Sequence, residues 1–283
     1  MDLAGPTRTV AEDAGSRPEV SPRRQAAPAA APVPVLDAPS DGPAARVAGR
    51  LDGRHPAIVF TLAALAGYVL LAALAIGLGL LLVDVLLPFH GLGRADEHVN
   101  RWFAAHRDGT LNDASYIGSM IGDSPVLPVL VALTAAGLML RRHRRIAGFV
   151  VAAILVEAAT YRIASLIVHR ERPAVPRLDH LPVNQSFPSG HVAASLAVYG
   201  GLAVLLTSAK PRRGLGAASW IVAALLVAAV AVSRMYRGMH HPLDVAAGLL
   251  VGAGAVLVAL FAARASGIAE RRRATPGARG SAT

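Results

Sequence analysis

Long apolar runs recur along most of this chain and restrict what it can fold into. About 20 apolar residues are needed for a helix to cross a bilayer, and residues 57–83 form a first run of that length. Further runs, separated by Pro, Gly and charged residues, lie at residues 116–140, 146–168, 192–207, 215–232 and 245–263. The pattern predicts an all-α protein, a bundle of six transmembrane helices.

The composition agrees with this class. Of the 283 residues, 54% are hydrophobic and only 16% are charged, a balance typical of membrane proteins. The net charge of +10 would also suit nucleic-acid binding. However, most Arg and Lys residues lie in short clusters beside the apolar runs, which fits membrane orientation better, and we expect no nucleic-acid partner. The chain has no cysteine, which excludes disulfides, thiol catalysis and Cys-ligated metal sites.

The segments outside the runs are polar. Residues 1–55 are rich in Ala, Pro and Arg without apolar periodicity, which predicts a disordered tail. We expect residues 56–266 to form the membrane domain and residues 267–283 a basic C-terminal tail. Between the first two spans, residues 94–107 mix Trp and Phe with charged residues. They predict a short amphipathic helix at the membrane interface, with a lid over a site as the alternative.

Basic clusters predict the orientation in the membrane. With both tails in the cytoplasm, the clusters at residues 46–54, 141–145, 210–213 and 271–273 all lie inside, as the positive-inside rule favours. The polar stretches at residues 169–173, 187–191 and 233–244 then share the extracytoplasmic face.

The polar stretch at residues 233–244 contains the strongest candidates for chemistry. Charged groups at a membrane boundary are costly to desolvate, so such a cluster suggests a functional site. His240 and Asp244 are four residues apart and share one helical face. A carboxylate that fixes the imidazole tautomer leaves the other ring nitrogen free as a nucleophile. A helix-capping ion pair is the alternative interpretation.

Two further features suit a phosphate ligand. The sequence Pro188-Ser-Gly-His191 begins the fourth run, where a helix N-terminus attracts anions. Ser189 would add a donor, Gly190 would permit close approach, and His191 could act as general acid. A plain helix cap would need the same residues. Arg172 and Arg234 offer guanidinium groups that match phosphate oxygens, although interfacial anchoring would also explain them.

In this order and spacing, the motifs resemble those of the type 2 phosphatidic acid phosphatase (PAP2) superfamily. The matching elements are Arg172-Pro173, then Pro188-Ser-Gly-His191, then Ser233-Arg234 followed at fixed spacing by His240 and Asp244. The resemblance covers roughly residues 57–265. It implies a six-helix membrane phosphatase that needs no metal and no cofactor.

The resemblance also implies a role for each motif residue. His240 would form a phosphohistidine, Asp244 would orient it, and His191 would protonate the leaving group. The phosphate would be held by Arg172, Ser189, Gly190 and Arg234.

One position departs from the family pattern. The first motif of the family begins with a lysine seven positions before Arg172, and here that position is Ser165. Arg162 lies three residues earlier on the same helical face and could reach toward the site. Arg170 could supply the charge instead. A competing interpretation pairs Arg162 with Glu157 inside the bundle.

The function expected from these features is hydrolysis of a membrane lipid phosphate or diphosphate, such as a polyprenyl diphosphate or phosphatidic acid. Two alternatives use the same residues. One is phosphoryl transfer to an acceptor other than water, and the other is binding or transport of a lipid phosphate without cleavage.

Overall fold

The structure is a computed structural model that describes Met1 and residues 34–39, 41–89, 91–123, 125–179, 185–209 and 213–274. The chain divides into two units, Met1–Ala31 and Pro32–Thr283, and every described residue except Met1 belongs to the second. Each regular element in these ranges is a helix, which confirms the predicted all-α class. In chain order the elements are η1 (Pro34–Leu36), α1 (Pro43–Arg50), α2 (Pro56–Leu80), η2 (Leu81–Leu86), α3 (Leu92–Ala105), α4 (Gly109–Met120), α5 (Val126–Leu140), α6 (Arg144–Ile167), α7 (Gly190–Ser195), η3 (Leu196–Gly200), α8 (Gly201–Ala209), α9 (Arg213–Tyr236) and α10 (Pro242–Ala274).

Within the described ranges, five helical segments are long and apolar enough to cross a membrane. They are Pro56–Leu86, Arg144–Ile167, Gly190–Ser208, Gly214–Tyr236 and Pro242–Ala274. The predicted second span is instead divided into α4 and the shorter apolar helix α5. Gly122 and Pro125 lie at this break, where proline lacks the amide that a continuous helix would use. The predicted count of six spans is therefore not confirmed by helix length.

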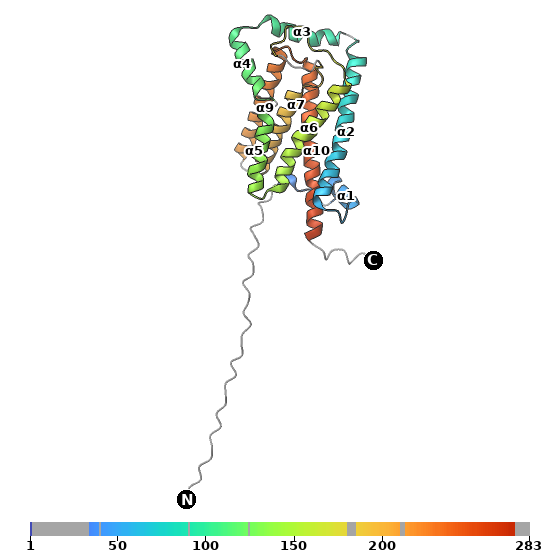
Figure 1. The fold of residues 1–283 in the computed structure, drawn as a ribbon, viewed down its shortest axis with the longest axis vertical. Coiled ribbons are helices and arrows are strands. Elements are labelled where there is room, and N and C mark those ends of the chain that lie inside the picture. The colour runs from blue at the N-terminus through green and yellow to red at the C-terminus, as the bar shows by residue number, and fades with distance from the viewer. Residues whose placement is uncertain are drawn as a thin grey trace. The chain divides into compact units, whose positions relative to one another are not determined.

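Helix α10 lies at the centre of the bundle. It packs against α2, α6, α7 and η3, and Figure 1 shows it behind α6 and beside α2. Many of its buried residues are small, including Gly248, Gly252, Ala255 and Ala259. Small residues let helices approach closely in lipid, where no hydrophobic effect drives helices together. This close packing aligns the first turn of α10 with the elements that carry the other polar stretches.

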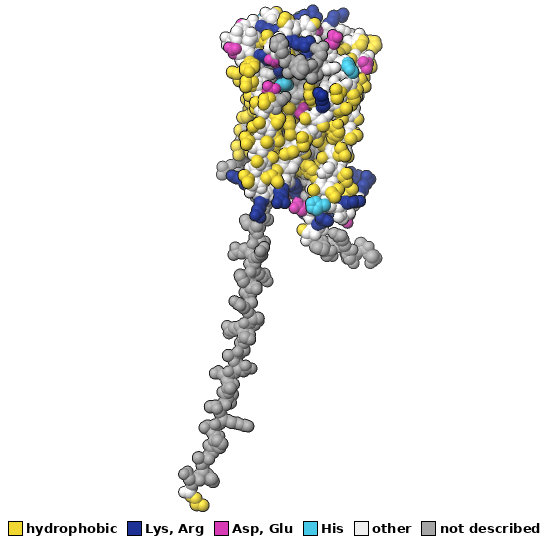
Figure 2. Space-filling view, in the orientation of Figure 1, with side chains coloured by type: hydrophobic (Ala, Val, Ile, Leu, Met, Phe, Trp, Pro, Cys, Tyr) yellow, Lys and Arg dark blue, Asp and Glu magenta, His cyan; other side chains and the backbone are white. Residues whose placement is uncertain are grey.

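The surface of the second unit is that of a multi-pass membrane protein. Figure 2 shows hydrophobic side chains covering its middle and charged side chains gathered at its two ends. On α2, for example, Leu65, Leu70 and Leu74 are all exposed. An apolar surface of this extent is rare on soluble proteins and typical of lipid contact.

Both predicted tails are partly structured. Helix α1 lies within the segment predicted as disordered, and Ala44, Ala45 and Ala48 are buried in a cluster that includes residues of α10. Leu36, in η1, is fully buried in the core. At the other end, α10 continues to Ala274, beyond the predicted boundary at residue 266. The tail predictions for residues 2–33 and 275–283 lie outside the described residues.

Helix α3 occupies the predicted region between the first two spans. It lies across one end of the bundle (Figure 1) and packs against α9 and α10. Its buried residues, Asp96 and Asn100, are polar. Thus α3 covers this end through polar contacts, and its placement at a membrane interface stays a prediction.

Candidate active site

The three polar stretches meet at the end of the bundle that α3 covers. The α6–α7 loop, the N-terminus of α7 and the α9–α10 turn carry them. Two glycines permit this arrangement. Gly238 has a φ of 69° in the α9–α10 turn, and a Cβ on Gly248 would lie 2.6 Å from the Ser189 carbonyl oxygen. The close approach lets the Ser189 amide donate to the Asp244 carbonyl at 3.0 Å, which joins two of the motifs.

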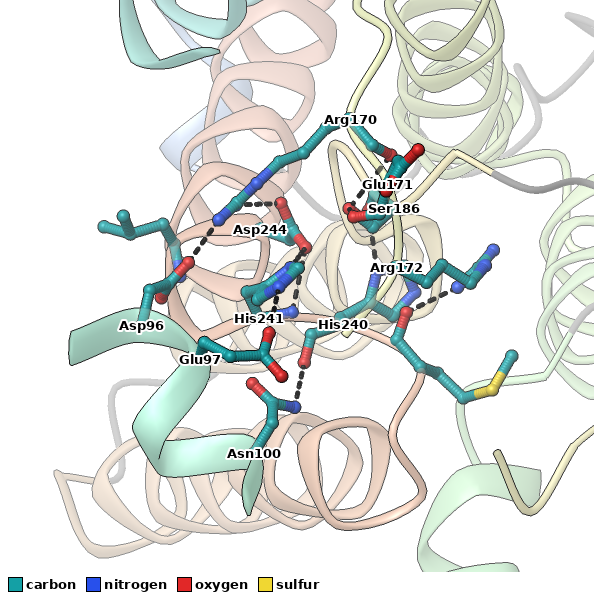
Figure 3. Close-up of polar contacts among 12 residues, drawn as sticks. Asp96, Glu97, Asn100, Arg170, Glu171, Arg172, Ser186, His240, His241 and Asp244 are labelled. Atoms are coloured by element: carbon teal, nitrogen blue, oxygen red, sulfur yellow. Dashed lines mark hydrogen bonds and ion pairs between the residues drawn. The ribbon is translucent and has the colours of Figure 1, made fainter. Parts of the chain in front are cut away.

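His240 lies in the α9–α10 turn and is 3% exposed. Its Nδ1 lies 2.7 Å from the Ser186 carbonyl oxygen (Figure 3). A carbonyl can only accept, so Nδ1 carries the proton and Nε2 the lone pair of the neutral ring. Burial, and next the charge of Arg234, lower the pKa of His240 well below its usual value. The side chain is thus held neutral with one nitrogen available as a nucleophile.

Asp244 has partners other than the predicted one. It accepts from the His241 amide at 2.8 Å and lies 3.2 Å from Nδ1 of the His241 ring, while its other oxygen pairs with Arg170. The expected hydrogen bond from His240 to Asp244 is therefore not formed, because Nδ1 of His240 donates to the Ser186 carbonyl instead. The reason lies in the position of Asp244 in the first turn of α10. There its carboxylate reaches back to the residue before the helix, as in a capping box.

Arg170 is buried between two carboxylates. Its guanidinium pairs with Asp96 of α3 on one side and with Asp244 on the other (Figure 3). The side chains of Arg170, Asp96 and Asp244 are 6%, 2% and 0% exposed. Each carboxylate would be costly to bury without this partner. The structure thus brings the candidate Arg170 to the site, but its charge is shared between Asp96 and Asp244.

The position that departs from the family pattern makes a hydrogen bond within its own helix. Ser165 is buried in α6, and its hydroxyl donates to the Arg162 carbonyl at 3.0 Å. The side chain of Arg162 is exposed, which gives no support to the expectation that it reaches into the site. The competing pair with Glu157 is not formed either, because Glu157 is buried and its Oε1 has no hydrogen-bond partner among the described residues.

Arg234 is 2% exposed and only partly hydrogen-bonded. Its Nη1 donates to the Ser119 hydroxyl at 2.7 Å and to the Asp179 carboxylate at 2.8 Å. Within the described part of the chain, no partner is found for the buried Nε and Nη2 of Arg234 or for the Ser189 hydroxyl. Buried donors in proteins are normally paired. Three such groups at one site indicate a ligand rich in acceptor oxygens.

Asp179 connects two arginines of the α9–α10 region. It accepts from Arg237 Nη2 at 2.6 Å and from Arg234 Nη1 at 2.8 Å. Although burial raises the pKa of Asp179, the hydrogen bond from Arg237 and the charge of Arg234 lower it overall. Asp179 therefore stays ionised and fixes one edge of the Arg234 guanidinium. The remaining two nitrogens, Nε and Nη2, have no partner within the described ranges.

His191 and Arg172 complete the predicted set. His191 lies in the first turn of α7, with Nε2 3.3 Å from Asp123. Arg172 is buried, which lowers its pKa, and its Nη1 donates to the Met239 carbonyl at 2.5 Å. After burial and Arg234, which lower the pKa of His240, and Asp244, which raises it, the charges of Arg172 and His191 lower this pKa further. Together with Arg234 and Asp244, they are thus close enough to His240 to affect its charge state.

Several residues of the site were not predicted. On α3, Glu97 lies 3.1 Å from Nε2 of His241, and Asn100 donates to the His240 carbonyl at 2.9 Å (Figure 3). Their spacing with Asp96 places all three on one helical face, a signal that the sequence contained. By contrast, the role of the Ser186 carbonyl has no sequence signal, because every residue has a carbonyl. Among the described residues, no group of three or more His, Asp or Glu side chains is arranged to hold a metal.

Comparison with known proteins identifies the family. The family model described as the PAP2 superfamily matches residues 129–266, which include the motif residues Arg172, His191 and His240. The chain belongs to the PAP2 superfamily. The resemblance drawn from the motifs is thereby confirmed.

Relatives of this PAP2 chain act on lipids, by their names. It is 35% identical over 129 residues to an undecaprenyl-diphosphatase of Sulfolobus acidocaldarius, a match that covers 44% of this chain and 58% of that protein. It is 36% identical over 125 residues to a decaprenylphosphoryl-5-phosphoribose phosphatase of Mycolicibacterium smegmatis, which covers 42% and 61%. The chain thus spans less than two thirds of the length of each of these curated relatives.

A solved structure shares the fold. The crystal structure of a transmembrane PAP2-type phosphatidylglycerolphosphate phosphatase from Bacillus subtilis aligns with a TM-score of 0.57 at 22% identity. The alignment covers 72% of this chain and 93% of that one. At this identity the likeness concerns the fold alone, and it agrees with the helical bundle described above.

Proposed function

We propose that this PAP2 chain is an integral-membrane phosphatase that hydrolyses a lipid phosphate or diphosphate through a phosphohistidine on His240. One observation carries the proposal. Beside a neutral, buried His240, the buried Nε and Nη2 of Arg234 and the hydroxyl of Ser189 have no partner among the residues that the structure describes. A transferred phosphoryl group has three equatorial oxygens that need such donors. The named activities of the two prenyl-lipid relatives support a lipid substrate.

In the first step, Nε2 of His240 attacks phosphorus and the bond to the leaving oxygen breaks. The Ser186 carbonyl stabilises the charge that develops on the ring, because it accepts the Nδ1 proton at 2.7 Å. Arg234, Arg172, the Ser189 hydroxyl and the Gly190 amide bind the phosphoryl oxygens. His191, which faces Asp123 at 3.3 Å, gives a proton to the leaving lipid oxygen.

In the second step, water attacks the phosphohistidine. The phosphorus–nitrogen bond breaks, His191 takes a proton from the water, and inorganic phosphate leaves with both residues restored. The arginines supply the positive charge that the transition state requires, so we propose that neither step uses a metal ion. Asp244 acts indirectly in this scheme, since it holds the α9–α10 turn through His241 and Arg170.

The basic residues support a direction in the membrane. The start of α6, the end of α10 and helix α1 share the end of the bundle opposite α3 (Figure 1). They carry Arg144 and Arg145, Arg271 to Arg273, and Arg46 and Arg50. We propose that this end is cytoplasmic, that the site is extracytoplasmic, and that α4 and α5 together form the sixth crossing. The positive-inside rule favours this direction.

The natural absence of cysteine makes the orientation testable. His98→Cys on α3 and Arg54→Cys before α2 each place a thiol at an exposed position at one end. In intact cells, a membrane-impermeant maleimide should label the first variant and not the second. The reverse pattern would refute the orientation.

The catalytic proposal is tested with purified protein on a panel of lipid phosphates and diphosphates, with a chelator present. Wild type should release inorganic phosphate, and His240→Ala should lower the rate on the order of a thousandfold or more. Labelled phosphate should remain on wild type after alkaline quenching, because phosphohistidine survives base. Transfer of the labelled phosphate to an added acceptor, instead of its release as inorganic phosphate, would favour a phosphotransferase. Binding without release by wild type would favour a lipid-phosphate binding protein.

A further inference from the structure

His241 follows the proposed nucleophile in the chain and lies between two carboxylates. Its Nε2 is 3.1 Å from an oxygen of Glu97 on α3, and its Nδ1 is 3.2 Å from an oxygen of Asp244 in the first turn of α10 (Figure 3). The His241 side chain is only 10% exposed, so water has little access to either ring nitrogen. The proposed reaction gives this ring no step, although its contacts connect α3 to the turn that carries His240.

Both ring nitrogens of His241 face acceptors, which indicates the charge of the ring. A neutral imidazole donates from one nitrogen and carries a lone pair on the other, whereas an imidazolium donates from both. Asp244 also accepts from the His241 amide at 2.8 Å and pairs with Arg170. Glu97 also accepts from the Ala174 amide at 3.1 Å. Since these partners are all donors, the contacts fit two ionised carboxylates and a doubly protonated His241.

The same contacts belong to a closed ring of alternating charges. Around it, Asp96 pairs with Arg170, Arg170 with Asp244, Asp244 with His241, and His241 with Glu97. Glu97 follows Asp96 on α3, so the ring begins and ends on one helix. With His241 protonated, three carboxylates share two cations, whereas a neutral His241 would leave them one. Because buried carboxylates depend on nearby cations, the ring favours the protonated form.

We infer that His241 is held as an imidazolium between Glu97 and Asp244, and that its charge helps to keep the nucleophile His240 neutral. The inference rests on the proposed phosphatase function and adds a positioning residue to it. His241 does not touch the phosphate in this scheme. It acts through Asp244, whose negative charge it offsets, and through its position next to His240.

Charged groups from each element around the turn act on His240. Burial and then Arg234 of α9 lower its pKa, and Asp244 of α10 raises it. The other groups that lower it are Arg172 of the α6–α7 loop and His191 of α7. An opposite charge nearby favours the charged form of a group. Without a positive His241 beside it, Asp244 would therefore favour the protonated form of His240, which cannot attack phosphorus.

Two variants that break the same ion pair separate charge from structure. A merely structural tie between α3 and the turn is lost in both His241→Gln and Glu97→Gln, so it predicts equal effects. The charge predicts opposite shifts in the acidic limb of kcat/KM, measured with a prenyl phosphate in detergent micelles. His241→Gln removes a positive charge near His240 and should move the limb up by about one pH unit. Glu97→Gln removes a negative charge and should move it down, because Asp244 still holds the protonated ring.

His98→Gln is the matched control, since His98 is exposed on the same helix as Glu97. It should leave the limb where it is in wild type. Shifts of the same sign in His241→Gln and Glu97→Gln, or an unmoved limb in His241→Gln, would overturn the inference while leaving the phosphatase function intact.

A second measurement tests the charge without turnover. In ¹⁵N NMR of the histidine-labelled protein in detergent, the signals of His241 are those missing from His241→Gln. Near neutral pH, both ring nitrogens of His241 should carry a proton in wild type, and a nitrogen without a proton would overturn the inference. If wild type hydrolyses no lipid phosphate, the phosphatase proposal fails, whereas the NMR experiment still decides the charge of His241.

Discussion

Both ends of the bundle hold arginine–aspartate pairs, but the pairs lie in different environments. At the site, the side chains of Arg170 and Asp96 are 6% and 2% exposed. At the opposite end, Arg145 pairs with Asp37 at 2.7 Å, and these side chains are 25% and 41% exposed. Arg271 also reaches Asp37, at 3.4 Å, and is still more exposed.

Because of this difference in burial, the ion pairs at the two ends differ in how strongly each charge depends on its partner. An exposed ion pair is screened by water and contributes little to stability. In a buried pair each charge depends on its partner, since desolvation of a lone charge is very unfavourable. The buried end also contains Arg234, two of whose nitrogens have no partner among the described residues. Polar groups are thus buried where a ligand is expected to bind, next to paired charges such as Arg170 and Asp96.

Among the variants that compare the two ends of the bundle, Arg234→Lys is expected to have the largest effect. Lysine keeps the positive charge but lacks the planar fork whose Nε and Nη2 face the proposed phosphate. We expect kcat/KM for a lipid phosphate to fall by about 10²–10³. Arg145→Lys makes the same change at the other end and should leave the activity unchanged. Equal activities of the two variants would show that the contrast between the ends has no functional meaning.

Arg170→Met tests the buried pairs. It leaves Asp96 and Asp244 as buried carboxylates without their common cation. Breaking such a pair typically costs about 3–5 kcal/mol, which should appear as reduced unfolding free energy in detergent. The double variant Arg170→Met with Asp96→Asn removes one of the stranded charges and should recover part of the loss. A single variant as stable as wild type would contradict the predicted dependence of these carboxylates on Arg170.

A smaller effect concerns the pH dependence of activity. Burial and then Arg234 lower the pKa of His240, and Arg172 lowers it further. Only the neutral ring attacks phosphorus, so kcat/KM should fall as the pH drops through this pKa, at a value below the usual 6.5 or so of histidine. In Arg172→Gln one of the lowering charges is lost, and the acidic limb should move to higher pH. An unmoved limb, whatever the change in rate, would contradict the electrostatic coupling.

The smallest effect is expected at the exposed end. Asp37→Asn removes the carboxylate that contacts Arg145 and Arg271. Because these groups are hydrated, we expect a change in unfolding free energy of no more than about 1 kcal/mol, with full activity. A loss as large as that of Arg170→Met would show that burial does not distinguish the two ends.

Sequence reasoning located most of the site but not its internal hydrogen bonds. The motif order predicted that His191, Arg234 and His240 converge, and the structure brings them together. The spacing of His240 and Asp244 also suggested a direct bond. That bond is not formed, because Asp244 accepts from the His241 amide at the start of α10 and His240 donates to the Ser186 carbonyl. Helical spacing alone specifies a shared face, not which of several nearby acceptors a donor selects.

The position of Ser165 shows the same distinction. The sequence indicated that a charge is missing there, and two arginines were possible substitutes. Arg162 proved to be exposed on α6. Arg170 lies in the site, where Asp96 of α3 is its second carboxylate partner beside Asp244. No pattern within residues 162–172 could reveal that partner, which lies more than 60 residues earlier in the chain.

By itself, the sequence determined the all-α class, the apolar helices and the identity of the phosphate-binding and nucleophilic candidates. Apolar run length and motif spacing are local properties, so they can be read along the chain. Tertiary structure alone decided the partners of His240, Asp244 and Arg170, and it alone placed His241 between two carboxylates. Hydrogen-bond partners and ion pairs depend on the packing of distant segments, because they are set by distances that only the folded chain brings within contact.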